Sequence, residues 1–194
     1  MKKFDLNKLK SDYAGILLDI GCGGRKHNEK FVGIDKRDLP NVDIVHDLET
    51  FPYPLPDESC LTIIGSHIVE HIKPWLTFDL MNELWRIMMP NGQLALSTPY
   101  AGSSEYFQDP THVNPFNQVT FQYFDPRYPL YNEYRPKPWR IAIGFPVWQT
   151  TGNLEAVMSK MSLEECEKIL EGIWGKAEEK ERVELTQVKG IANV

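Results

Sequence analysis

One short segment combines a carboxylate and a histidine at a spacing that could support proton transfer, reading Asp109-Pro-Thr-His112. A histidine titrates near neutral pH and can accept a proton from an attacking oxygen or nitrogen, and a neighbouring carboxylate can orient its ring. We therefore predict that His112 is a general base and that Asp109 assists it. The alternative, in which Asp109 begins a proline turn and His112 only holds a loop in place, stays open.

A second segment reads His67-Ile-Val-Glu70-His71. On a helix, two histidines four residues apart share a face and can bind zinc, and the pattern matches the H-x-x-E-H signature of inverted zinc peptidases. A catalytic zinc site needs a third protein ligand, and no later segment offers a helix with a well-spaced glutamate. The peptidase hypothesis also leaves the glycine-rich turn described next without a role. We therefore expect no metal site.

A glycine-rich turn follows the first predicted strand. The apolar residues 16–18 lead to Asp19 and then to a turn that contains Gly21, Gly23 and Gly24. Glycines let a backbone approach a bound molecule without collisions of Cβ atoms, and they supply the positive φ angles that a sharp strand exit can require. This turn is predicted to cradle a ligand.

A second short strand ends in Asp35. A carboxylate at the tip of the second strand of a doubly wound sheet can accept hydrogen bonds from both hydroxyls of a ribose. A dinucleotide would call for the pattern G-x-G-x-x-G, but Lys26 stands where the third glycine would be if counting begins at Gly21. The connection between the turn and the strand is also too short for a full crossover helix, whose N-terminus would favour a phosphate. Both observations argue against a pyrophosphate ligand.

Further segments follow in a characteristic order. They read D-I-G-C-G at 19–23, V-G-I-D ending at Asp35, V-H-D-L at 45–48, P-L-P-D-E-S at 54–59, S-H-I-V-E-H at 66–71 and L-W-R-I-M-M-P-N-G-Q at 84–93. In these motifs the sequence resembles the class I S-adenosylmethionine-dependent methyltransferases, and the likeness covers residues 16–124. The short connection after the glycine turn is similar to that of a bacterial and phage subgroup with a truncated first helix.

The resemblance implies that the chain binds S-adenosylmethionine and transfers its methyl group to an oxygen or nitrogen atom. It assigns the methionine end to the glycine turn, the ribose to Asp35, and the adenine to Asp47 with Leu48. His67 is also predicted to help His112 in proton transfer. The predicted cofactor-binding residues are Asp19, Gly21, Cys22, Gly23, Asp35, Lys36, Asp47, Leu48, Ser66 and His67.

The elements that must position these residues are predicted from apolar runs and their punctuation. Strands are expected over 16–20, 31–35, 42–45, 60–65, 93–97, 139–148 and 182–188, and helices over 4–12, 74–89 and 162–180. Ser162 and Glu165 form a capping box at the start of the last helix. The fold class is therefore α/β. The resemblance implies a single Rossmann-like methyltransferase domain over 1–194, with a mostly parallel sheet and an antiparallel C-terminal edge.

Residues 99–140 differ in composition from the rest of the chain. They hold eleven of the 22 aromatic residues together with several prolines. Such a segment is typical of a lid or pocket wall built from rigid side chains, and we predict that it forms the acceptor pocket. A large surface loop that packs over the sheet is the alternative.

Composition narrows the choice of partners and location. The chain has 194 residues, a net charge of −6 and three cysteines that lie far apart. An acidic balance argues against a nucleic-acid acceptor, and sparse cysteines suit a reducing compartment. No apolar run has the length of a signal peptide or a membrane span. We therefore expect a cytoplasmic protein with no membrane partner; its oligomeric state is not indicated.

The predicted function is methyl transfer to a small-molecule or glycan acceptor. The alternative is a non-catalytic S-adenosylmethionine-binding or protein-interaction module. It stays open because the first crossover is short, and because Leu61-Thr62 stand where family members often carry an acidic residue at the start of a strand.

Overall fold

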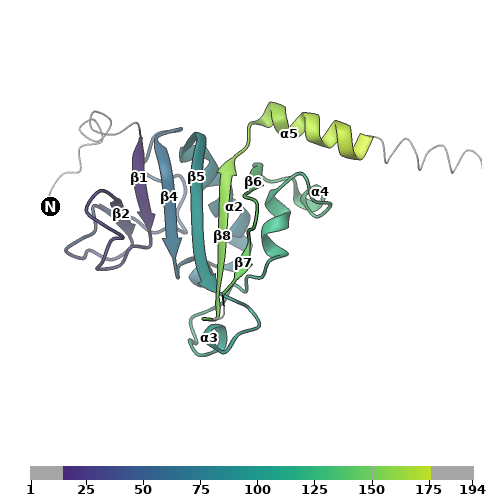
Figure 1. The fold of residues 1–194 in the computed structure, drawn as a ribbon. Coiled ribbons are helices and arrows are strands. Elements are labelled where there is room, and N and C mark those ends of the chain that lie inside the picture. The colour runs from purple at the N-terminus through teal and green to yellow at the C-terminus, as the bar shows by residue number, and fades with distance from the viewer. Residues whose placement is uncertain (1–14, 150, 176–194) are drawn as a thin grey trace, which may run out of the picture.

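The structure, a computed structural model, describes residues 15–149 and 151–175. Its centre is an eight-stranded sheet with the order β3-β2-β1-β4-β5-β8-β6, in which β7 also pairs with β8 (Figure 1). The strands are β1 (Ile16–Ile20), β2 (Val32–Asp35), β3 (Ile44–Val45), β4 (Cys60–Ser66), β5 (Met88–Pro99), β6 (Trp139–Ile141), β7 (Val147–Trp148) and β8 (Asn153–Lys160).

Strands β1 to β5 run parallel to one another, whereas β8 runs antiparallel to β5, β6 and β7. The predicted α/β class is therefore confirmed, including the antiparallel edge. In a parallel sheet the carboxyl ends of the strands meet at one edge, and ligands bind outside that edge where the strand order reverses. Here the reversal falls at β1, between β2 and β4.

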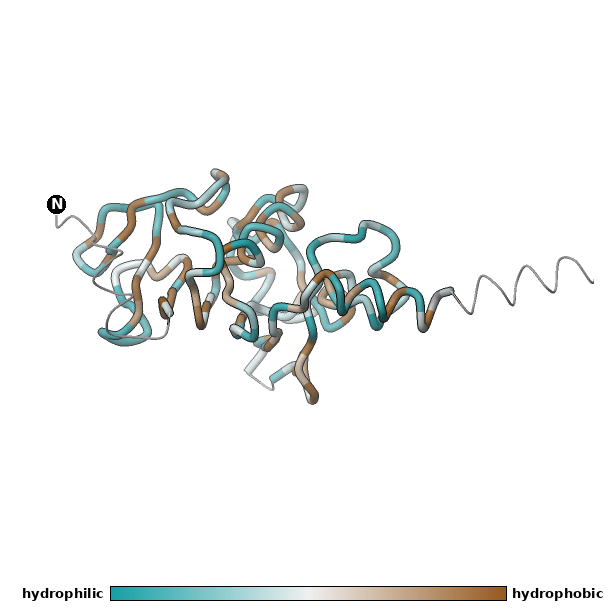
Figure 2. The backbone as a smooth tube through the Cα atoms, turned by 90° about the horizontal axis from the view of Figure 1, so that it is seen from above, coloured by the Kyte–Doolittle hydropathy of each residue, from teal (hydrophilic) through white to brown (hydrophobic). Residues whose placement is uncertain are grey.

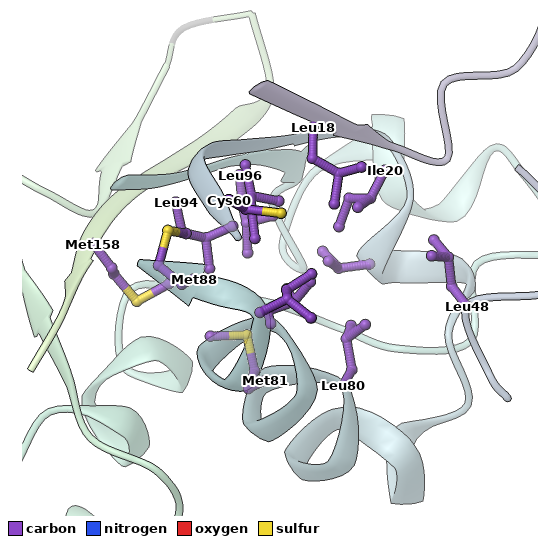
Figure 3. Close-up of a cluster of buried hydrophobic side chains, with 14 of the residues drawn as sticks. Leu18, Ile20, Leu48, Cys60, Leu80, Met81, Met88, Leu94, Leu96 and Met158 are labelled. Atoms are coloured by element: carbon purple, nitrogen blue, oxygen red, sulfur yellow. The ribbon is translucent and has the colours of Figure 1, made fainter. Parts of the chain in front are cut away.

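The core lies between the sheet and α2 (Thr77–Ile87). One row of buried side chains crosses the sheet, because Leu18 pairs with Ile63, Ile63 with Leu94, and Leu94 with Met158. Helix α2 packs its apolar face, which includes Leu80, against this surface of the sheet (Figure 3). The helix starts three residues later than predicted because residues 74–76 form a 3₁₀ turn, η2 (Pro74–Leu76).

The predicted strand over 93–97 is longer in the structure. Met88 already pairs with Cys60, and a register shift then accommodates the following residues before Gln93 pairs with Thr62. Asn91 has a φ of +63° in this irregular stretch. The helix therefore ends at Ile87, two residues earlier than predicted, and Pro90-Asn91-Gly92 interrupts a strand instead of ending the helix.

The C-terminal strands differ most from prediction. The single strand expected over 139–148 is two short strands, β6 and β7, separated by a turn at Gly144, whose φ is +84°. Strand β8 was not predicted, although it lies between β5 and β6 in the sheet. The predicted elements over 4–12 and 182–188 lie outside the described residues.

Residues 21–31, all of which are described, contain no helix between β1 and β2. The chain makes irregular turns there, as the short connection predicts. The segment 100–138 is also mostly irregular. Its short helical turns are α3 (Ser104–Phe107), η3 (Thr120–Phe124) and α4 (Tyr131–Tyr134).

The 100–138 segment is attached to the turn after β4, where residues 69–71 form η1 (Val69–His71). The amide groups of Val113 and Asn114 both donate hydrogen bonds to the carbonyl oxygen of Glu70, at 2.9 and 3.0 Å. The side chain of Asn114 also donates to Oγ1 of Thr77 (2.8 Å). A part of the chain distant in sequence is therefore fixed beside the edge of the sheet.

Helix α5 (Leu163–Leu170) begins where the capping box predicts, and the turn η4 (Glu171–Gly175) continues it. The hydroxyl of Ser162 accepts a hydrogen bond from the backbone N–H of Glu165 at 3.1 Å. Among the described residues no helix combines the length and apolar character needed to cross a membrane. Figure 2 shows that hydrophobic and hydrophilic residues alternate along the chain.

Replacing Ser162 by alanine should lower the free energy of unfolding by about 1 kcal/mol, because the first turn of α5 loses its cap. Chemical denaturation measures this change. Ser162→Asp keeps an acceptor oxygen at the same place and should retain most of the stability. Equal losses in both variants would contradict the capping role.

Candidate functional site

A cavity of about 600 Å³ lies at the carboxyl ends of β1, β2, β3 and β4, at the point where the strand order reverses. Six of the residues predicted from the sequence line it: Gly21, Asp35, Lys36, Asp47, Leu48 and His67. The cavity is also lined by residues that were not predicted, among them Arg37, Glu49, Ile68, His71, Lys73 and Thr111. Residues that follow four different strands therefore meet at one site.

The glycine turn forms one wall of the cavity. Gly21 and Gly23 have φ angles of +65° and +56°, and a Cβ atom on Gly21 would lie 2.4 Å from Cγ1 of Ile68. Asp19 does not line the cavity. Its carboxylate is buried behind the turn and accepts a hydrogen bond from the N–H of His27 (2.8 Å), and burial raises its pKa. Asp19 therefore holds the turn in shape.

Cys22 is buried and does not line the cavity. Burial, followed by the charge of Asp19, raises the pKa of its thiol to about 11. A thiol with this pKa stays protonated at neutral pH and is a poor nucleophile. Cys22 therefore acts as a packing residue of the turn.

Asp35 lies at the tip of β2, as predicted, and it is fully hydrogen-bonded. Its Oδ1 accepts from the N–H and Nε of Arg37 (2.9 and 3.0 Å), and its Oδ2 accepts from the N–H of Gly23 (2.9 Å) and Nη2 of Arg37 (3.3 Å). Burial alone would raise the pKa of Asp35, but these hydrogen bonds outweigh burial and lower it. The carboxylate is therefore held in its charged form.

Arg37 was not predicted from the sequence. Its side chain is 62% exposed while it covers the Asp35 carboxylate. A carboxylate offers about four acceptor positions, and all of them are engaged here. A ribose that binds Asp35 must therefore displace the guanidinium, which can move into solvent. The sequence carries no local signal that distinguishes this arginine from a solvated one.

Asp47 and Leu48 follow β3 at the far side of the cavity. Asp47 is exposed, and its Oδ1 accepts a hydrogen bond from the N–H of Glu49 (3.0 Å). Leu48 is buried and presents an apolar surface. Nearby, the carboxylate of Glu49 pairs with Nζ of Lys73 (2.7 Å), which ties the turn after β3 to the turn after β4. Such a corner suits a flat, partly polar ring.

Ser66 ends β4, and His67 follows in a left-handed conformation with a φ of +51°. The N–H of His67 donates to the carbonyl oxygen of Ser97 (2.8 Å), which links the ends of β4 and β5. The imidazole ring is 48% exposed, and its Nδ1 lies 3.4 Å from Oε1 of Glu70. The backbone conformation thus turns this ring into the cavity.

Asp109 and His112 do not line the cavity, although Thr111 between them does. Nδ1 of His112 lies 2.7 Å from the carbonyl oxygen of Tyr106, so it carries a proton and donates it there. Nε2 of His112 is 3.8 Å from Oδ2 of Asp109, beyond hydrogen-bond distance, and the ring is 7% exposed. The predicted base is therefore buried behind His71, against which it packs with ring centroids 4.9 Å apart.

Comparison with known proteins identifies the fold. No protein-family model matches the sequence, and no curated protein matches it. Among solved structures, a SAM-dependent methyltransferase from Archaeoglobus fulgidus is 17% identical, with a TM-score of 0.54 over 80% of this chain and 91% of its own. A second from Aquifex aeolicus is 18% identical, with a TM-score of 0.50 over 82% and 91%.

A further solved structure, the [4+2]-cyclase SpnF, is 14% identical, with a TM-score of 0.52 over 80% of this chain and 79% of its own. At these identities the comparisons show the fold. The chain has the class I fold of S-adenosylmethionine-dependent methyltransferases, and the predicted fold is confirmed.

Proposed function

We propose that this protein is an S-adenosylmethionine-dependent methyltransferase. The observation that carries the proposal is the convergence of Gly21, Asp35, Asp47, Leu48 and His67, from four strand ends, on one cavity at the switch point of the sheet. These are the positions that the methyltransferase motifs of the sequence assign to the cofactor. The cavity volume, about 600 Å³, falls in the range of small-molecule sites.

The cofactor would extend from the corner after β3 to the turn after β4. Asp47 and Leu48 would hold the adenine, Asp35 the ribose after Arg37 moves aside, and the glycine turn the methionine end. Asp35 is charged and has a buried, fixed carboxylate, so it can replace the guanidinium donors by two ribose hydroxyls. Lys36 would line the wall, whereas Ser66, Cys22 and Asp19, which do not line the cavity, would support it from behind.

The reaction would be an in-line displacement at the sulfonium methyl. The acceptor oxygen or nitrogen forms a bond to the methyl carbon while the sulfur–methyl bond breaks, and S-adenosylhomocysteine leaves. Much of the acceleration comes from holding the nucleophile near and aligned, a contribution of up to about 7–11 kcal/mol in favourable cases. No covalent enzyme intermediate is required.

The acceptor would enter beside His67, His71 and Thr111, which line the cavity. His67 is the histidine with an exposed ring in the cavity, and we propose it as the group that takes the acceptor proton. A direct role of His112 as base stays a prediction, since its ring is buried. The acidic charge of the chain favours a small molecule or glycan over nucleic acid.

Two measurements test the proposal. Calorimetry should detect binding of S-adenosylmethionine and of S-adenosylhomocysteine to the full chain. NAD, which carries a pyrophosphate, should bind far more weakly. Tritium from cofactor labelled in the methyl group should then appear in an acceptor of a cell extract. Binding without transfer to any fraction would support the non-catalytic module instead, and absence of binding would refute both.

A further inference from the structure

We propose that Glu70, His71 and His112 form a binding site for a divalent transition-metal ion. Each residue offers one ligand atom, and the three atoms lie within 4.8 Å of one another. Glu70 and His71 belong to η1, and His112 comes from the segment that packs beside it. The third ligand is thus supplied by a residue about forty positions later in the chain.

The carboxylate of Glu70 gives the first evidence. Its side chain has no exposed surface, and its Oε2 accepts a hydrogen bond from Oγ1 of Thr98 at 3.0 Å. Its Oε1 has no hydrogen-bond partner among the described residues; Nδ1 of His67 lies 3.4 Å away but does not form a hydrogen bond with it. A buried polar atom without a partner is costly and calls for an explanation such as a bound ion. A metal ligated by Glu70 would satisfy this oxygen.

The two histidines give the second, independent evidence. Nδ1 of His112 donates to the carbonyl oxygen of Tyr106 (2.7 Å). Nδ1 of His71 lies 3.3 Å from the carbonyl oxygen and 3.1 Å from Oγ1 of Thr111, whose own proton goes to Asp109. Each ring is therefore held with its proton on Nδ1, which leaves Nε2 with a free lone pair.

This arrangement matches the support that metal ligands have in proteins. A ligating histidine usually donates its other N–H to a carbonyl or carboxylate, and a ligating carboxylate is itself hydrogen-bonded. All three residues have such a partner here. Ligands about 2.1 Å from a metal lie roughly 3–3.5 Å from each other, so loading the site needs the three atoms to approach by no more than about 1.5 Å.

The donor set selects the metal. Two imidazole nitrogens and one carboxylate oxygen suit Zn²⁺ and related transition metals, whereas Mg²⁺ prefers an all-oxygen set. Three protein ligands leave coordination positions open, as in catalytic rather than structural zinc sites. The sequence pattern His67-x-x-Glu70-His71 matches a zinc motif but lacks a third ligand. In the structure His112 supplies that ligand. The proposed ligands from the motif are Glu70 and His71, not the two histidines His67 and His71.

The location defines what the ion would do, and this step rests on the proposed function. His71 and Thr111 line the cavity wall where the acceptor would enter. A hydroxyl oxygen bound to the ion would lose its proton more readily, to His67 or to solvent, and would be held for attack on the methyl carbon. The acceptor class is therefore an alcohol or phenol rather than an amine.

Metal alone, without cofactor, provides the direct test. The full chain, freed of metal by a chelator, should bind one equivalent of Zn²⁺ in calorimetry, and millimolar Mg²⁺ should not compete. Glu70→Gln and His112→Gln keep the shape of each side chain and should weaken Zn²⁺ binding at least tenfold. His27→Gln removes an exposed histidine far from the cluster in sequence and should change nothing.

Unaltered Zn²⁺ affinity in both Glu70→Gln and His112→Gln would overturn the proposal. To guard against misfolding, Zn²⁺ should raise the melting temperature of the parent and of His27→Gln, while folded His112→Gln should show no shift. Equal shifts in all three proteins would also overturn it.

The site and the proposed function can fail separately. Zn²⁺ binding that depends on Glu70 and His112, without binding of S-adenosylmethionine, would refute the methyltransferase while the metal site stands. Methyl transfer that survives chelation would refute the role of the ion in the reaction. Transfer that falls at least tenfold on chelation and returns with Zn²⁺ would support both.

Discussion

Replacing Gly21 by alanine should lower the free energy of unfolding by roughly 2–5 kcal/mol and abolish cofactor binding. The φ of +65° disfavours any L-residue by about 1–2 kcal/mol. The new Cβ would also lie 2.4 Å from Cγ1 and 2.9 Å from Cβ of Ile68, so the backbone of Ile68 must move. Overpacking of this kind adds about 1–3 kcal/mol. Guanidinium unfolding measures the loss.

Gly24→Ala is the matched control for this change. Gly24 lies in the same turn, has no positive φ, and an added Cβ would meet nothing closer than Cδ1 of Leu39 at 4.0 Å. We expect its free energy of unfolding to stay within about 1 kcal/mol of the parent's. A glycine-to-alanine change at a compatible position can even stabilise a protein, because it reduces the conformational entropy of the unfolded chain. If both variants lose the same stability, the special geometry of Gly21 is refuted.

Replacing Asp35 by alanine should weaken S-adenosylmethionine binding by about 1.5–3 kcal/mol, the contribution of hydrogen bonds to a charged group. This corresponds to a dissociation constant roughly 10- to 150-fold higher in calorimetry. The effect arises because no other side chain replaces the buried carboxylate at the tip of β2. Unchanged affinity would remove Asp35 from the site.

Asp38→Ala provides the comparison for Asp35. Asp38 is exposed, lies three residues later and does not line the cavity. Its removal changes the net charge by the same amount but leaves the ribose position intact. We expect affinity within about twofold of the parent, since exposed charges contribute little. A similar loss in both variants would indicate long-range electrostatics instead of direct contact.

The parallel half of the fold was predictable because its signals are local. Short apolar runs such as Ile16–Ile20 end in glycine or aspartate, and the strands match these runs within two residues. Strand β8 was missed for a different reason. Its sequence Asn-Leu-Glu-Ala-Val-Met-Ser-Lys contains good helix formers, and its extended state depends on pairing with β5 and β6.

The residues of the candidate site likewise fall into those that local sequence signals predict and those that depend on packing between distant segments. Gly21, Asp35 and Asp47 lie at, or within two residues of, the ends of predicted strands, so their convergence follows from the topology of a parallel sheet. The approach of His112 to His71 has no local signal, because it depends on how an irregular segment packs. The cover of Arg37 over Asp35 was equally hidden, since nothing in the sequence distinguishes that arginine from a solvated one.

The paired hydrogen bonds from Val113 and Asn114 to the carbonyl oxygen of Glu70 have a consequence for motion. They hold residues 113 and 114 against η1, whereas Phe107 and Tyr134 on either side are 74% and 64% exposed. Native-state hydrogen exchange should therefore rank amides 113 and 114 among the slowest of the segment. Because Val113 also lines the cavity, this rim should keep its form even when exposed side chains of the segment, such as Phe107, change position.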